Sequence, residues 1–355
     1  MAPTLISAPL NFPYTAVGLT AAVNVMPNVY GLLNALDVFP ARGLTSNVVQ
    51  VRREEHTLAV LPAEERGGPA SVAARKRGDV LFLPIPHFPH LDTILPEDLQ
   101  NLLVTDGMSA RPATLNDAMN RRLLAIRNKH AITREWVRMG ALKGLIVDGY
   151  NREIINLFDA FDIAQKTIGF DLANADSDID GACAQIVEHV QTNLRGETMT
   201  RVRIILSSSL FTKFIRHKNV QKYWLNWNGA EMMAHMRRAD MGAQFGRVFV
   251  FQNIEFVEYY GVAPLLDGPG GAPLSAPFVE ADAGYAYPVG TMDAFATYDA
   301  PANDIRFVNQ PGQEVYISPE ALEHGKGVEL MTESNPLAVC RRPATLVKVV
   351  AGPTP

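Results

Sequence analysis

One long amphipathic stretch constrains this chain more than any other feature. Pro112 and Thr114 precede it, and Thr114 with Asp117 three residues later resembles a capping box, a side-chain pairing that starts many helices. The stretch stops at Gly144, so residues 114–143 are predicted to form one helix of about 45 Å. Apolar residues recur along it in steps of three and four and predict one buried face: Met119, Leu123, Ile126, Ile132, Trp136 and Met139.

The opposite face of this predicted helix is basic. It carries five arginines: Arg121, Arg122, Arg127, Arg134 and Arg138. Such a face can contact nucleic acid, or it can lie against solvent or a neighbouring subunit, and we favour the second interpretation. The formal net charge of the chain is −5, which excludes a molecule that binds polyanions over its whole surface. Any phosphate contact is therefore expected from a local patch.

The residues before the helix predict parts that cannot bury themselves. Residues 1–40 combine several prolines with many apolar residues, which indicates an extended arm that lies on another surface. Short β-patterned runs at 49–51, 58–61 and 80–83 predict a long two-stranded ribbon with a polar tip at 67–69. Because an isolated hairpin is marginal in water, this ribbon is expected to need a neighbouring molecule.

A proline-broken connector follows the ribbon and contains three residues of metal-ligand type. His87 and His90 are separated by prolines that prevent the helix needed to align them, and Asp92 has no further ligand of known position beside it. We therefore interpret the connector as a loop that packs on a sheet edge rather than as a metal site.

Directly after the long helix, the chain predicts a hairpin and a second helix. The hairpin turns at Asp148–Gly149. Asp176 or Asp178 is expected to cap the helix, and Cys183 lies within its apolar stripe. Cys183 is therefore predicted to be a small core residue and not a nucleophile.

The remaining residues alternate between strand and helix patterns, which predicts an α+β fold. We expect a buried strand at 201–209, a helix at 209–227 and a pair of strands within 247–261. Residues 261–277 are rich in glycine and proline and predict a surface loop. Short strands are expected to follow, and residues 332–349 end in a strand that pairs with an earlier part of the chain.

Composition sets further bounds. The 355 residues are 47% hydrophobic and 19% charged, which allows a sizeable core and suggests a surface covered in part by partners. Two cysteines, Cys183 and Cys340, make no disulfide framework and favour a reducing compartment. No apolar run reaches about 18 residues and no basic leader precedes one, so we expect neither a membrane span nor a signal peptide.

Motifs of catalysis and cofactor binding are missing from the sequence. The stretch at 324–328 lacks the first glycine and the hydroxyl of a P-loop, and no dinucleotide fingerprint follows a strand. Ser208 does not lie in a nucleophile elbow. Scattered carboxylates such as Glu153, Asp159 and Asp162 have no spacing that marks an acid–base pair. We predict no catalytic, cofactor or metal site, and no enzyme.

Three segments in this order resemble the major capsid proteins of tailed bacteriophages, which have the HK97-like fold. They are "LPEDLQNL" at 95–102, "RRLLAIRNKHAITREWVRMGALKG" at 121–144, and "ESNPLAVCRRPATLVKV" at 333–349. Within that group the chain is similar to the lambda-type major head proteins, the capsid protein E family.

The resemblance implies a division into parts. Residues 1–40 would form the N-terminal arm and 41–92 the extended loop. Residues 93–164 would form a peripheral domain containing the spine helix, 165–318 the axial domain, and 319–355 a return to the peripheral domain. The last strand is then expected to pair with the hairpin that follows the long helix.

The resemblance also implies a function. Copies of the subunit would form pentamers and hexamers of an icosahedral head around double-stranded DNA, with scaffold and portal proteins and with a decoration protein in many relatives. The shell would assemble in the host cytoplasm, without a membrane or cofactor, and touch DNA only non-specifically. Candidate contacts between subunits are Val49, Val51, Leu58, Val60, Arg66, Arg75, Arg77, Val80, Arg121, Arg127, Arg134, Arg341 and Arg342.

Two other classes of protein stay open at this point. One is another phage structural protein, such as a tail-tube or decoration component, although these usually lack so long a helix. The other is a soluble α/β enzyme with an unrecognised site, which should form a small closed oligomer.

Overall fold

The computed structural model describes residues 14–26, 31–53, 79–100, 103–106, 109–112, 115–226, 246–266 and 273–354.

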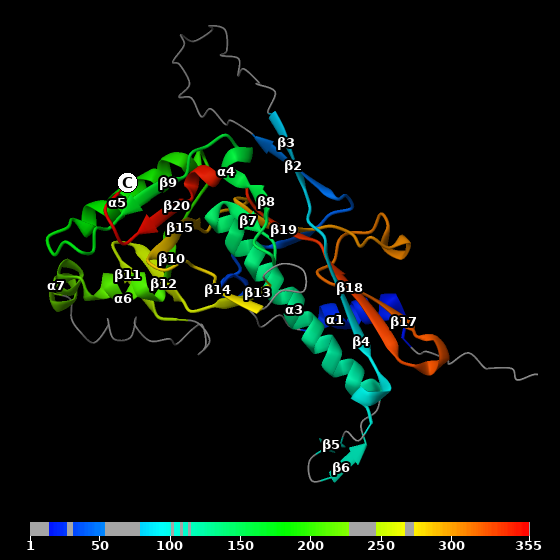
Figure 1. Ribbon diagram of the computed structural model, residues 1–355. Coiled ribbons are helices and arrows are strands. Elements are labelled where there is room, and N and C mark those ends of the chain that lie inside the picture. The colour runs from blue at the N-terminus through cyan, green and yellow to red at the C-terminus, as the bar shows by residue number, and fades with distance from the viewer. Residues whose placement is uncertain are drawn as a thin grey trace, which may run out of the picture.

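The long helix runs through the middle of the fold. Helix α3 spans Leu115–Lys143, as predicted, and crosses the molecule from one β-region to another (Figure 1). It ends at Gly144, which has a φ of +83°, and an added Cβ there would meet the Phe158 ring at 2.0 Å. Only glycine fits this position, because it adopts the left-handed backbone without strain and leaves room for the Phe158 ring. Thr114, half of the predicted capping box, lies outside the described residues.

A six-stranded sheet forms the larger β-region. In spatial order its strands are β11 (Val248–Phe251), β12 (Ile254–Tyr259), β10 (Arg201–Ser207), β15 (Ala283–Val289), β20 (Val347–Val350) and β9 (Lys166–Gly169). β10 is parallel to β12 and antiparallel to β15, whereas β20 is antiparallel to β15 and parallel to β9. Side chains of one face pack on helices α5 (Ile179–Leu194) and α6 (Ser208–Arg216), and those of the other join the core around the C-terminal half of α3.

A smaller region surrounds the N-terminal half of α3. Its sheet has the order β17 (Tyr316–Ala321), β18 (Val328–Ser334) and β4 (Phe88–Ile94), and helix α1 (Ala16–Val25) packs beside it. A third sheet, β1 (Ala41–Gly43), β16 (Phe295–Asp299) and β19 (Pro336–Cys340), belongs to the main core with α3. The main core and the α1 region are separate apolar clusters, and α3 contributes to both.

Short elements connect these regions. The hairpins are β2 (Val48–Arg53) with β3 (Asp79–Pro84), β5 (Leu103–Asp106) with β6 (Ser109–Pro112), β7 (Leu145–Val147) with β8 (Glu153–Asn156), and β13 (Val262–Leu266) with β14 (Pro273–Pro277). The short helices are α2 (Leu32–Ala35), α4 (Leu157–Ala160), α7 (Lys218–Asn226), η1 (Pro96–Asp98), η2 (Ile305–Phe307), η3 (Glu323–Gly325) and η4 (Pro343–Thr345).

Predictions that rested on local signals are confirmed. The β7–β8 hairpin follows α3, and Asp178 caps α5 by accepting a hydrogen bond from the Gly181 N–H at 2.8 Å. Cys183 is fully buried in the apolar stripe of α5. The helix expected at 209–227 is divided into α6 and α7, because His217 has an extended backbone.

The predicted partner of the last strand is wrong. Residues 332–349 contain the C-terminal end of β18, the whole of β19 and most of β20. β19 pairs with β16, and β20 pairs with β15 and β9. The β7–β8 hairpin takes part in none of these pairings. The short helix η4, which begins at Pro343, redirects the chain between β19 and β20. Proline cannot donate to a ladder, so neither strand continues through Pro343, and the two strands belong to different sheets.

Three other expectations are corrected. Within the predicted arm, residues 16–25 form helix α1, because Leu19 and Val23 bury themselves against this chain's own core. Residues 88–94 form an edge strand and not a loop, since they pair along the whole of β18. The predicted loop at 261–277 contains the β13–β14 hairpin.

Candidate functional site

Five polar side chains on the middle of α3 form a buried group, called here the spine network. Arg134 donates two hydrogen bonds to Asp299 at the end of β16, at 2.6 and 2.9 Å, and lies 3.7 Å from Glu314. Arg127 pairs with Glu314 at 2.5 Å. Arg127 and Arg134 are 5% and 3% exposed, so both guanidinium groups are buried, and the Arg134–Asp299 pair is shielded from solvent on both sides. The members of the spine network are Arg127, His130, Arg134, Glu135 and Arg138.

Glu135 holds the chain that leads into α2. Its carboxylate accepts hydrogen bonds from the Leu33 N–H at 2.8 Å and from the Tyr259 hydroxyl at 3.1 Å. Gly31 has a φ of +96°, and a Cβ there would lie 2.4 Å from the Glu135 carboxylate. Arg138 donates hydrogen bonds to the Asn34 side-chain oxygen at 3.0 Å and to the Phe39 carbonyl at 3.1 Å, in the segment that contains α2. The spine helix thus fixes where the N-terminal part of the chain lies.

Burial and charge oppose each other in this network. Burial raises the pKa of Asp299, although Arg134 favours its ionised form. Burial would also raise the pKa of Glu314, but Arg134 and Arg127 outweigh it and lower the pKa. Burial, and then the charge of Arg134, lowers the pKa of Arg138 to about 10. Each charge therefore depends on its partners, since an unpaired ion at this depth is costly.

These positions correct the prediction of a basic outer face. Arg127 and Arg134 are buried within this chain and paired, so they offer no surface to a neighbouring subunit or to DNA. Arg121 is exposed, as predicted. Arg122 is half-buried and pairs with Asp98 at 3.3 Å.

His130 joins α3 to β18. Its Nε2 lies 3.1 Å from the Thr332 hydroxyl, which donates to the His90 carbonyl and must therefore accept from the ring. Its Nδ1 lies 2.8 Å from the Ser334 hydroxyl, which then donates to it. The neutral imidazole is thus satisfied on both sides.

Acid is expected to weaken this contact. Burial, followed by the positive charges of His90, Arg127 and Lys129, lowers the pKa of His130 to about 3. An unfolded histidine titrates near pH 6.5, so below that value the unfolded state binds more protons and stability falls toward pH 3. His130→Gln, which cannot take up the proton, should flatten this dependence by up to about 1.4 kcal/mol per pH unit in urea unfolding. His324→Gln, at an exposed site, is the control. Equal slopes for the wild type and His130→Gln would contradict the prediction.

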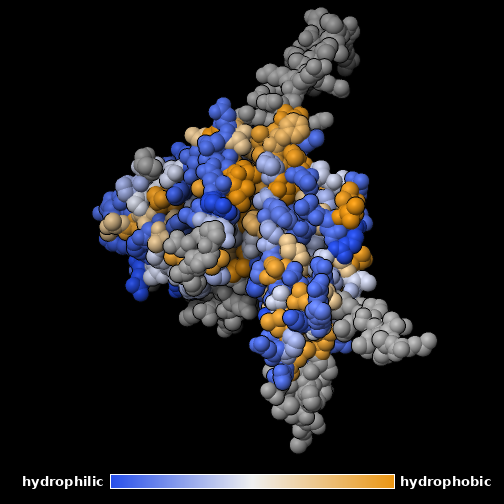
Figure 2. Space-filling model, turned by 45° about the vertical axis from the view of Figure 1, so that its right-hand side comes forward, coloured by the Kyte–Doolittle hydropathy of each residue, from blue (hydrophilic) through white to orange (hydrophobic). Residues whose placement is uncertain are grey.

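The foot of the predicted ribbon is described by β2 and β3. Val49 and Val51 are 2% and 3% exposed and belong to the main core, which corrects their assignment as contacts between subunits. Val80 and Phe82 on β3 are 37% and 59% exposed, and Figure 2 shows apolar side chains gathered on the surface at this foot. The ribbon is therefore fixed to its own subunit on one face and presents apolar surface on the other.

The other ribbon candidates lie outside the described residues: Leu58, Val60, Arg66, Arg75 and Arg77.

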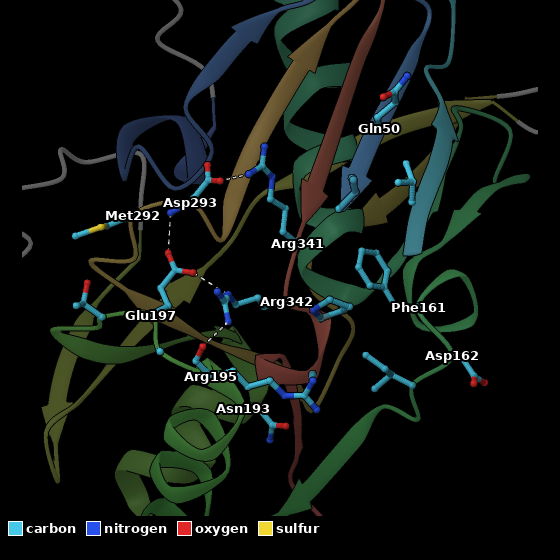
Figure 3. A pocket seen from close by; sticks show the side chains of 17 residues that line it. Gln50, Phe161, Asp162, Asn193, Arg195, Glu197, Met292, Asp293, Arg341 and Arg342 are labelled. Carbon is cyan, nitrogen blue, oxygen red and sulfur yellow. Dashed lines mark hydrogen bonds and ion pairs between the residues drawn. The ribbon is translucent and has the colours of Figure 1, made fainter. Parts of the chain in front are cut away.

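A hollow of about 970 Å³ lies between the foot of the ribbon and the C-terminal end of α5 (Figure 3). Arg341 pairs with Asp293, which also pairs with Arg42 at 2.5 Å. Arg342 pairs with Glu197 at 2.8 Å and donates to backbone carbonyls at the end of α5. Both Arg341 and Arg342 thus tie parts of this chain together while they line an open hollow, and a role between subunits stays a prediction for them.

The thiols of Cys183 and Cys340 are buried, and burial raises the pKa of each, to about 12 for Cys340. No group of three histidine, cysteine or acidic side chains in the described part of the chain could hold a metal ion. None of the helices in that part is long and apolar enough to cross a membrane.

The fold is that of phage capsid subunits. The chain superposes with a TM-score of 0.61 on the crystal structure of a putative capsid protein of a prophage of E. coli CFT073. The superposition covers 95% of this chain and 99% of the other at 13% sequence identity, which shows the HK97-like fold.

The sequence comparison is more specific. Residues 15–351 match the family described as phage major capsid protein E, so the chain belongs to that family, whose members build phage heads. It is 25% identical to the major capsid protein of Salmonella phage Felix O1, over 94% of this chain and 95% of that one. It is 27% identical to the major capsid protein of Pseudomonas phage KPP10, over 95% and 96%.

Proposed function

We propose that this chain assembles into pentamers and hexamers of a closed icosahedral shell that encloses double-stranded DNA. The family match across residues 15–351 carries this proposal, because it spans nearly the whole chain. The β2–β3 ribbon supports it, since one face is buried in its own subunit while Val80 and Phe82 are exposed. Scaffold, portal and decoration proteins, and assembly in the host cytoplasm, belong to the same proposal.

The proposal also includes the division into parts. Residues 1–40 are the arm, 41–92 the extended loop, 93–164 and 319–355 the peripheral domain, and 165–318 the axial domain. Two separate apolar clusters along α3 support two structural regions. The pairing of β20 with β15 and β9 shows that the end of the chain also contributes to the large sheet.

Negative-stain microscopy of the expressed full chain tests this function. We expect closed particles, formed by the chain alone or together with the proteins encoded beside it. Tubes would favour a tail-tube protein, and a small oligomer of fixed size would favour a soluble enzyme. Either outcome would contradict the proposed shell.

A further inference from the structure

The connection between β16 and β17 presents apolar side chains to solvent. Figure 1 shows it as the orange segment that projects beside β19. In its short helix η2, Ile305 is 92% exposed, and Val308 directly after the helix is 54% exposed. Phe307 points inward instead, with its ring 4.9 Å from that of Tyr316. The same turn therefore buries one apolar side chain and holds out two.

The segment is firmly held on both sides of Ile305. Asn335 donates from its side chain to the Pro301 carbonyl at 2.9 Å, and the Asn303 N–H donates to Glu333 at 2.7 Å. On the other side, the Gly312 N–H donates to the Leu44 carbonyl at 2.9 Å. Ile305 is thus presented by an ordered backbone, which lowers the entropy lost when a partner covers it.

A hollow lies directly beside this projection. Its volume is about 680 Å³, and residues 45–47, 300–305 and 308–309 form most of its wall, together with Ile85, His87 and Asn335. Alanine, proline, isoleucine and valine supply the apolar part of this wall, and asparagine, serine, threonine, His87 and Asp304 supply the polar part. Ile305 projects from the wall of this partly apolar hollow, so the projection and the hollow share one face.

The face carries almost no free charge. Residues 44–47 and 307–313 contain no charged side chain. Asp304 and Arg306 form an ion pair with each other, so they cancel. Two copies that meet through this face would not repel one another, whereas a like-charged patch would.

We propose that this face is a contact between copies of the chain, in which Ile305 of one copy enters the hollow of its neighbour. A projection and a hollow side by side are self-complementary, so each copy can give and receive in the same contact. A second copy is the occupant because the chain belongs to a family that builds shells from many copies of one protein. This inference rests on the proposed shell assembly and assigns one of its contacts.

The test compares Ile305→Asp with Ile305→Leu in the full chain. Aspartate places a charge at a position that the contact would bury in the partly apolar hollow, whereas leucine keeps an aliphatic side chain of the same size. We expect Ile305→Asp to lower the particle yield at least about tenfold and Ile305→Leu to preserve it. Because Ile305 contributes little to the subunit core, both variants should show the wild-type circular dichroism and urea midpoint before assembly.

The outcomes separate this inference from the proposed function. A normal particle yield from Ile305→Asp would overturn the assigned contact and leave shell assembly standing, with this face then free for a different protein. A wild-type chain that stays monomeric at every concentration would overturn both. Val308→Asp, at the other exposed apolar site, should repeat the loss, and normal particles from both aspartate variants would exclude the whole face.

Discussion

Replacing Arg134 with serine is expected to lower the free energy of unfolding of the subunit by about 3–5 kcal/mol. The substitution leaves Asp299 buried without its bidentate partner, and the Asp299 side chain is only 3% exposed. It also removes a positive charge beside Glu314. Removing one member of a buried pair is far more damaging than never having built the pair, because the remaining ion keeps its desolvation cost.

Urea unfolding followed by circular dichroism measures this loss. All variants must be compared at one protein concentration, since self-association adds to apparent stability. Arg121→Ser, on the same helix but exposed, should stay within about 0.5 kcal/mol of the wild type. A double variant, Arg134→Met with Asp299→Leu, should recover much of the loss because it removes both ions. Wild-type stability in Arg134→Ser would show that the spine network is not important for folding.

Deleting residues 62–78 is expected to abolish particle formation while the subunit still folds. The foot of the ribbon stays intact in this variant, because Val49, Val51 and Leu83 remain buried in the main core. What is lost is the segment between the two strands of the foot, and we propose that a neighbouring copy covers this segment. Particle yield in negative stain and the urea midpoint of the subunit are the two measurements.

A matched control keeps the length of the ribbon. Replacing residues 62–78 with a glycine–serine segment of equal length should also prevent assembly, because a flexible chain offers no apolar or charged contacts. Normal particles from the deletion would show that these residues contribute nothing between subunits. Loss of the folded subunit would show that they support their own core.

Local signals in the sequence predicted several elements of the fold correctly. The stop of α3 at Gly144, the Asp178 cap of α5 and the turn at Asp148–Gly149 each depend on residues within a few positions of one another. The resemblance to capsid proteins rested on short segments of the same kind, and the family match confirms it. Several residues predicted to lie between subunits, such as Val49 and Arg134, are buried in their own chain. Whether a side chain is exposed depends on distant parts of the chain.

The spine network shows this limit most clearly. A helical pattern places Arg127 and Arg134 opposite the main apolar stripe, which normally means solvent. Glu314 and Asp299 then approach from more than 150 positions away and bury both arginines. The sequence did contain one indication that this face of α3 is buried. Small and apolar residues lie near Arg134 and are buried with it: Ala131, Val137 and Ala141.

The amino-acid sequence by itself determined the extent of the long helix, the cap of α5, the turn at Asp148–Gly149 and the family of the chain, because caps, turns and periodicity act over a few residues. Only the tertiary structure decided that Arg127, Arg134 and Arg138 of α3 are internal ions and that β19 and β20 enter different sheets. Strand partners and the burial of charge depend on which distant segments meet, and the free energy of these contacts arises only once the chain has closed around α3.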